Sequence, residues 1–168
     1  MLKLVTIGGY GYTEQRFFGA LRAAKVDTFV DIRQRRGMRG PTYAFLNSGR
    51  LQASLAREGI RYVHAKELAP TASIRSVQKD ADRAQDVTKH ARTTLAPGFV
   101  AAYEREILSK FDARSFSTLV GPSTSIVALF CVEGQPDACH RSVVSKRFAS
   151  ELNIPCENLV PTSASGSD

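Results

Sequence analysis

The stretch from Ile126 to Leu152 constrains the fold more than any other part of the chain. Its first part, Ile126 to Val132, is almost entirely apolar and rich in β-forming residues, which predicts a strand buried on both faces. Gly134 and Pro136 then require a turn. Apolar residues follow at the spacing of one helix face, namely Val144, Phe148 and Leu152. Strand, turn and helix in this order form half of a βαβ unit, the building block of parallel α/β folds.

The turn inside this stretch gathers reactive and charged side chains. They are Cys131, Glu133, Cys139, His140 and Arg141. Cys131 and Glu133 are two residues apart, so both point to one side if the strand extends that far. Counting back four residues from the helix face places His140 inward and turns Arg141 toward the rim. Because α/β proteins bind ligands where a strand's carboxyl end meets the next helix, this turn is the first candidate site.

These residue types favour catalysis. The free N–H groups of a helix start favour an anion and lower the pKa of a nearby thiol, so Cys139 is a candidate nucleophile. Glu133 is a candidate general base or acid with His140 as its partner. Cys131 joins this candidate catalytic set, although a small buried core residue is its plainer interpretation. A Cys/His zinc site would lack the usual CxxC pair, so we predict no metal and no cofactor.

A second candidate region follows the predicted strand from Asp27 to Ile32. Residues 33–41 contain four arginines within seven residues, together with two glycines and a proline, which predicts a loop. Arginines in such a loop can hold phosphate through forked guanidinium contacts, and neighbouring aromatic rings can stack on bases. The candidate substrate-binding residues here are Arg33, Arg36, Arg39 and Tyr43, with Arg141 from the later turn. The alternative is a basic loop that only raises solubility.

Two more predicted strands end in candidate contacts. The strand from Leu2 to Ile7 precedes a glycine-rich turn with Tyr10, which does not match the GxGxxG fingerprint. The strand from Ile60 to Ala65 precedes Glu67. Because parallel strands deliver their carboxyl ends to one edge of a sheet, we expect both residues, the arginine loop and the cysteine-containing turn to line one cleft.

The remaining pattern predicts an α/β fold with one domain over residues 1–160. Its mostly parallel sheet has about four or five strands flanked by helices. Further helices are predicted from Thr13 to about Lys25, from Ser48 to Glu58, from Pro97 to about Lys110, and over Ser115 to Val120. The charged segment from Ser73 to Thr94 predicts a solvated surface helix or a mobile excursion, with a lid or a nucleic-acid contact as the alternative. The tail 161–168 is small and polar, which predicts disorder.

The net charge indicates the kind of ligand, and the cysteine content indicates the cellular compartment. The chain has 168 residues, with 23 Lys and Arg against 16 Asp and Glu and a formal net charge of +7. This balance favours an anionic ligand such as a nucleotide or a nucleic acid. Three cysteines without paired spacing are typical of a reducing compartment. The sequence shows neither an apolar signal segment nor a run of the ~20 apolar residues that a membrane helix needs, so we expect a cytoplasmic protein without membrane contact.

A series of motifs spans nearly the whole chain. In order, they are Thr6-Ile7-Gly8, Asp31-Ile32-Arg33 with Asn47 downstream, Gly59 to His64, Glu67-Leu68, Cys131-x-Glu133 and Cys139-His140-Arg141. In these motifs the chain resembles the bacterial and archaeal family catalogued as domain of unknown function 488. The resemblance implies an α/β fold and a shared cleft, but no particular reaction. Many members read G-H-S-N where this chain has Gly8 to Gly11, so roles of that histidine and serine do not transfer.

These observations predict an enzyme that acts on a phosphate-bearing substrate, either a nucleotide or a nucleic acid. Its cleft would be lined by the arginine loop and the C-x-E…C-H-R segment. One alternative is a non-catalytic protein that binds nucleic acid or a nucleotide. A further alternative is a metal-dependent enzyme that uses Cys131, Glu133, Cys139 and His140. The sequence leaves the oligomeric state open.

Overall fold

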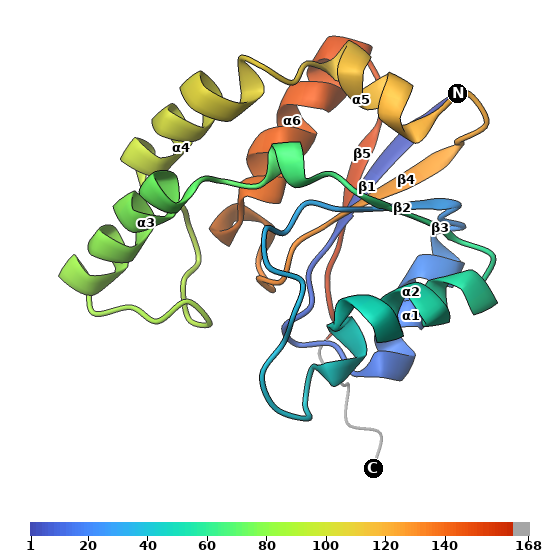
Figure 1. Cartoon of the computed structure of the whole chain (residues 1–168), viewed down its shortest axis with the longest axis horizontal. Coiled ribbons are helices and arrows are strands. Elements are labelled where there is room, and N and C mark those ends of the chain that lie inside the picture. Colours follow the sequence, from blue (N-terminus) through green and yellow to red (C-terminus); the bar gives the residue numbers. More distant parts are fainter. Residues whose placement is uncertain (163–168) are drawn as a thin grey trace.

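Five parallel strands form one sheet in the computed structural model, which describes residues 1–162 (Figure 1). The strands are β1 (Lys3–Ile7), β2 (Thr28–Asp31), β3 (Arg61–His64), β4 (Ile126–Phe130) and β5 (Cys156–Leu159). Their order is β3-β2-β4-β1-β5, and every neighbouring pair is parallel. The prediction of an α/β fold with a parallel sheet is therefore confirmed, and four of the strands lie where the sequence indicated.

Helices cover both faces of this sheet (Figure 1). The six are α1 (Glu14–Ala23), α2 (Ser48–Arg57), α3 (Ala72–Ala84), α4 (Pro97–Tyr103), α5 (Ala113–Val120) and α6 (His140–Leu152). Helices α1 and α2 pack on one face, while α4, α5 and α6 pack on the other with α3 against α4. Thr13 caps α1 by accepting a hydrogen bond from the Arg16 N–H at 3.3 Å, and Pro97 opens α4, as the sequence predicts.

Alternation along the strands supplies two hydrophobic cores. In β4, Val127 and Leu129 point to the face of α4, α5 and α6, whereas Ala128 and Phe130 point to the face of α1 and α2. Both faces are covered, so the strand reads as a continuous apolar run. The core over α6 contains the predicted Val144 and Phe148, while Leu152 is partly buried against it.

The charged segment 73–94 divides into two parts. Its first part forms α3, which buries only Ile74 and Gln78. Its second part leaves the helix and returns across the carboxyl side of the sheet, where Arg92 reaches Glu133. The expectation of a solvated helix is therefore confirmed for α3, which is mostly exposed, and the part after α3 is tied to the rest of the fold by Arg92.

The C-terminal part of the described chain lies at one edge of the sheet. Strand β5 pairs with β1 at the edge of the sheet. Most of the predicted disordered tail, 161–168, lies outside the described residues, and within them Thr162 accepts a hydrogen bond from Arg16 at 2.7 Å. Over residues 1–162, every helix is too short or too polar to cross a membrane.

Candidate functional site

A cavity of about 920 Å³ opens where the carboxyl ends of the central strands meet α3. Its lining comes from the turns after β1, β2 and β4, from α3, and from the segment that follows α3. These turns lie side by side because β2, β4 and β1 are neighbours in the sheet. The volume is in the range of pockets that enclose small ligands.

The bottom of this cavity carries four polar side chains, which we call the floor. They are Cys131, Glu133, Cys139 and His140, and all four are buried. The Cys131 thiol donates to Glu133 Oε2 at 3.1 Å, so the two side chains share one side of the chain as predicted. Cys139 Sγ lies 3.7 Å from His140 Nδ1. The turn between β4 and α6 therefore brings two thiols, a carboxylate and an imidazole together at one place.

The backbone fixes His140 and Cys139. His140 Nε2 lies 3.1 Å from the carbonyl oxygen of Ile32, which it can only approach as a donor, so Nδ1 of the neutral ring presents its lone pair to Cys139. Burial lowers the pKa of His140, but the Cys131 sulfur, the Glu133 carboxylate and the Ile32 carbonyl together raise it above its ordinary value. Cys139 caps α6, where its sulfur accepts from the Arg141 N–H at 3.5 Å.

Cys131 is held as a thiol. Its hydrogen bond with Cys139, its burial and the nearby Glu133 carboxylate raise the pKa of the Cys131 thiol well above its ordinary value. The Cys131 and Cys139 sulfurs and a ring nitrogen of His140 all lie within 4.8 Å of one another. Two sulfurs and an imidazole at this separation can also serve as the ligands of one metal ion.

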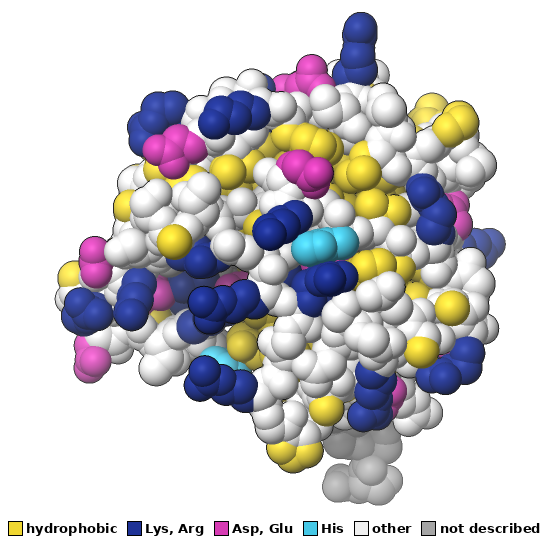
Figure 2. Space-filling model, in the orientation of Figure 1, with side chains coloured by type: hydrophobic (Ala, Val, Ile, Leu, Met, Phe, Trp, Pro, Cys, Tyr) yellow, Lys and Arg dark blue, Asp and Glu magenta, His cyan; other side chains and the backbone are white. Residues whose placement is uncertain are grey.

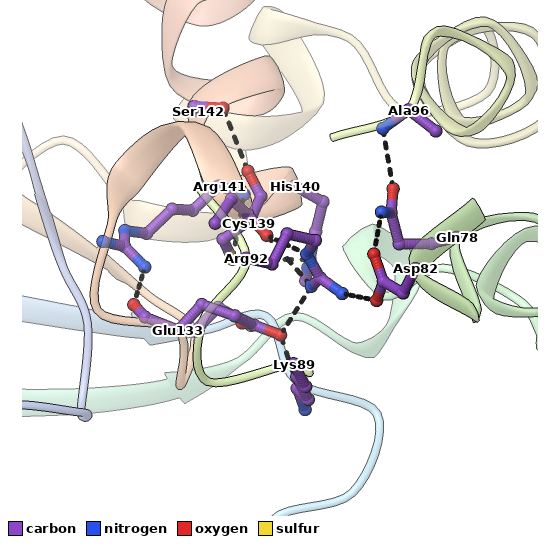
Figure 3. A network of polar contacts seen from close by, with 12 residues as sticks. Gln78, Asp82, Lys89, Arg92, Ala96, Glu133, Cys139, His140, Arg141 and Ser142 are labelled. Atoms are coloured by element: carbon purple, nitrogen blue, oxygen red, sulfur yellow. Dashed lines mark hydrogen bonds and ion pairs between the residues drawn. The ribbon is translucent and has the colours of Figure 1, made fainter. Parts of the chain in front are cut away.

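Glu133 is ionised and paired. Burial raises the pKa of its carboxyl, but the Lys89 charge, the Cys131 hydrogen bond and His140 outweigh burial and bring this pKa to about 2. Its Oε1 lies 3.4 Å from both Lys89 Nζ and Arg92 Nη2 (Figure 3). Since the carboxyl stays deprotonated near neutral pH, Glu133 cannot serve as a general acid and is a weak base.

Helix α3 and the segment after it, residues 72–96, form the side of the cavity that we call the wall. Arg92 joins the wall to the floor, because its guanidinium also pairs with Asp82 at 2.6 Å and donates to the Ala138 carbonyl (Figure 3). Gln78 binds the Asp82 carboxylate and the Ala96 N–H at 2.7 and 2.8 Å. These contacts close a polar network from α3 to the start of α4.

The lining is strongly basic. It carries eight Lys and Arg side chains against the acids Asp82 and Glu133, and Lys and Arg gather on this side of the molecule (Figure 2). The eight are Arg33, Arg35, Arg39, Arg75, Lys79, Arg83, Lys89 and Arg92. Most of the net positive charge of the chain therefore surrounds one cavity, where it attracts an anion.

Within the arginine loop the four side chains behave differently. Arg35 and Arg39 are exposed and line the cavity. Arg33 lines it too but is buried: it pairs with Asp31 at 2.8 Å, donates to the Leu46 carbonyl at 3.0 Å and lies over the Phe130 ring. Its Nη1 is buried without a hydrogen-bond partner in the described chain, so an anion oxygen would be a favourable partner for it.

Two of the predicted binding residues, Arg36 and Glu67, do not line the cavity. Arg36 turns instead to the Tyr62 hydroxyl at 3.3 Å. Glu67 is exposed in the 3₁₀ turn Lys66–Leu68 after β3, which is an edge strand and lies away from the β2-β4-β1 centre. The prediction that these two residues face the shared cleft is therefore wrong.

Arg141 does not lie at the rim either. It is 0% exposed, and its guanidinium donates to the backbone carbonyls of Glu133 and Gly134. Gly8 makes room for it, because a Cβ there would lie 2.0 Å from the Glu133 carbonyl and 3.0 Å from the guanidinium. Arg141 and Gly8 therefore hold the floor in shape, and neither lines the cavity.

Aromatic side chains line the mouth of the cavity. The predicted Tyr10 and Tyr43 meet edge to face with ring centroids 5.1 Å apart, and the Tyr43 hydroxyl accepts from the Gly11 N–H. His90 of the wall stacks on Tyr10 at 3.9 Å. Beside the arginine loop, these rings offer surfaces on which a nucleobase can stack.

The sequence interpretation named no residue of the wall as a site residue and treated a lid or a nucleic-acid contact there only as an alternative. None of Arg75, Lys79, Asp82, Lys89, His90 and Arg92 was predicted to belong to the site, although all six line the cavity. The segment has few large apolar residues to fix its direction, and an ion pair between Arg92 and Glu133 leaves no local signal across 41 residues of sequence. Its density of positive charge is the one feature that pointed toward an anion site.

Comparison with protein families matches residues 13–148 to the family described as domain of unknown function DUF488. The chain belongs to this family. The match runs from the cap of α1 into α6 and includes every floor residue. Comparisons with curated proteins and with solved structures gave no match. The family therefore agrees with the resemblance seen in the motifs, and function has to be argued from the site itself.

Proposed function

We propose that this DUF488 protein is an enzyme that acts on a phosphate-bearing substrate, a nucleotide either free or at an accessible position of a nucleic acid. The observation that carries this proposal is the meeting of two thiols, an imidazole and a carboxylate at the floor of a cavity lined by eight basic side chains. A merely soluble basic surface does not need buried reactive groups beneath it.

Binding would use cations and aromatic rings of the lining. Arg35 and Arg39 are exposed in the arginine loop and can form charge-assisted hydrogen bonds with phosphate oxygens. The half-buried Arg75, which already donates to Gln34 and the Pro70 carbonyl, adds positive charge on α3. Tyr10 and Tyr43 lie at the same cavity and can stack on a base. A cavity of about 920 Å³ suits one nucleotide or a few, rather than a nucleic-acid duplex.

Reaction would use Cys139 and His140. In the metal-free chain Cys139 is oriented as a nucleophile, because its sulfur caps the start of α6 and His140 Nδ1 lies 3.7 Å away as a proton acceptor. Glu133 would act by charge and position, since its pKa of about 2 keeps it from donating a proton. Cys131 would support Glu133 through its thiol hydrogen bond.

The test is a ligand screen followed by product analysis. Nucleotides and modified nucleosides are screened by thermal shift, since a ligand at a hundredfold excess over its Kd stabilises the fold by about 2.7 kcal/mol. Each hit is then incubated with the protein and analysed for conversion. We expect conversion by the wild type and a loss of about 100-fold or more in Cys139→Ser and His140→Gln, with binding retained.

Arg39→Ala supplies the contrasting variant, because Arg39 is exposed in the arginine loop, apart from the four floor side chains. It should weaken binding and leave turnover at saturation close to the wild-type value. If ligands bind tightly to the wild type but are not converted, catalysis is rejected and the alternative of a non-catalytic binding protein is supported. Full conversion by Cys139→Ser would reject the assignment of Cys139 as nucleophile.

A further inference from the structure

Three floor residues have the arrangement of a metal site. The ligand atoms of Cys131, Cys139 and His140 lie within 4.8 Å of one another. In a tetrahedral zinc site, bonds of about 2.3 Å to sulfur and about 2.0 Å to nitrogen put those two ligand atoms about 3.5 Å apart. Cys139 Sγ and His140 Nδ1 are 3.7 Å apart before any ion is considered. This pair therefore already has the spacing of two ligands of one ion.

The environment of His140 is a second, independent observation. Histidines that bind metals almost always donate their other ring N–H to a carbonyl or a carboxylate, which fixes the ring and the tautomer. Here Nε2 meets the Ile32 carbonyl at 3.1 Å, just beyond the end of β2. Nδ1 is thereby aimed at the sulfurs. A histidine that only filled the core would not need its free nitrogen directed at a thiol.

Charge and access fit the same assignment. Two thiolates neutralise a divalent ion, and Glu133 keeps its charge for Lys89 and Arg92. Sulfur and imidazole ligands select zinc and similar soft ions over magnesium or calcium. The three residues also line the cavity, so a fourth position faces the substrate space, as it does in catalytic zinc sites with three protein ligands.

We propose that Cys131, Cys139 and His140 bind one zinc-type divalent ion, with the fourth position open to the cavity. On binding, each thiol releases its proton to solvent and becomes a thiolate ligand. Cys139 is then a ligand rather than the nucleophile, and the ion would supply Lewis-acid chemistry beside the basic side chains of the cavity. The assignment does not depend on the identity of the substrate.

The test uses the whole chain and metal ions alone. The protein is purified under reducing conditions, stripped with a chelator, and titrated with cobalt(II) and zinc(II). We expect one equivalent of cobalt to produce thiolate-to-metal charge-transfer absorption, and zinc to abolish that absorption by displacement. Cys139→Ser should weaken binding about tenfold or more.

Cys156→Ser is the matched control, because Cys156 is an exposed cysteine on β5 and does not line the cavity. It should bind cobalt as the wild type does, and far-UV circular dichroism shows whether each variant is folded. A wild-type chain that gives no thiolate absorption with cobalt would overturn the metal site. So would a signal that persists in Cys139→Ser and disappears in Cys156→Ser.

These outcomes separate the two proposals. Metal binding without nucleotide conversion would support the metal site and reject the proposed enzymatic function. Nucleotide conversion by a chelator-treated protein that binds no cobalt would reject the metal site and support Cys139 as the nucleophile.

Discussion

The floor and the wall of the cavity are built by different means. The floor is buried, and backbone groups hold it: His140 meets the Ile32 carbonyl, and Arg141 binds the carbonyls of Glu133 and Gly134. The wall is charged, buries only Ile74 and Gln78 within α3, and reaches the floor through side-chain ion pairs such as Arg92 with Glu133.

This difference suits two tasks. Groups that react must keep their geometry within a fraction of an ångström, which buried hydrogen bonds from strand ends provide. Groups that attract a charged ligand can tolerate movement, because the attraction acts over several ångströms. We therefore expect a backbone change beside the floor to lower stability strongly, and damage to the wall to change binding and local motion.

The largest effect should follow from Gly8→Ala. The new Cβ would lie 2.0 Å from the Glu133 carbonyl and against Arg141, so the backbone of the floor has to shift. We expect a loss of about 3 kcal/mol or more in the free energy of unfolding, measured in urea. Gly49→Ala is the control, because Gly49 is exposed in α2 with open space around it, and it should be neutral or stabilise the fold by about 0.5 kcal/mol. Equal behaviour of the two variants would contradict a rigid floor.

The second effect is a pH dependence at the contact between floor and wall. The pKa of Glu133 is about 2 in the folded chain against an ordinary value of 4.5. The stabilisation, on the order of 3 kcal/mol, is therefore complete above pH 4.5 and is lost as the pH falls toward 2.

The measurement compares the wild type with Glu133→Gln in urea at pH 7 and at pH 3. The advantage of the wild type should shrink by about 2 kcal/mol between these two conditions. Glu14→Gln changes an exposed acid on α1 and should show a small difference that hardly varies. A constant gap for Glu133→Gln would mean that the carboxylate is not stabilised by its cationic partners.

The same contrast explains what the sequence could predict. Strand β4 and helix α6 follow from an apolar run and from the spacing of Val144 and Phe148, so the positions of Cys131 and His140 could be inferred. Strand β5 was not predicted, because its residues are mostly exposed and polar. Its assignment comes from pairing with β1, which is a tertiary contact.

Arg141 shows a different limit. Residue type alone suggests that an arginine beside a candidate site binds the ligand, and the helical spacing points it toward the rim. The structure buries it because two backbone carbonyls turn inward and Gly8 leaves space for the guanidinium. Such a pocket is made by three separate parts of the chain, so no local pattern reports it.

A third, smaller effect should show that the wall can open locally while the floor stays closed. Arg92→Ala removes the contacts with Glu133, Asp82 and the Ala138 carbonyl at once. We expect a loss of about 2 kcal/mol in stability and faster amide hydrogen exchange over residues 85–96, with β4 still protected. Arg105→Ala, an exposed arginine outside the cavity, is the control. Equally faster exchange in β4 and in 85–96 would show that the two regions open as one unit.

The smallest effect on stability should come from Arg83→Ala. Arg83 lies on the wall with its side chain 72% exposed and pairs weakly with Asp80 at 3.7 Å, so the free energy of unfolding should change by less than about 0.5 kcal/mol. Arg83 still lines the cavity, and each phosphate contact that disappears reduces the slope of log K against log salt by about 1 or less. Pyrophosphate binding measured between 50 and 200 mM salt should therefore show a shallower slope in Arg83→Ala than in Arg105→Ala. Suppose instead that Arg83→Ala and Arg105→Ala have the same salt slope, while Arg39→Ala has a shallower one. The phosphate is then held by the arginine loop alone, and the wall only covers the floor.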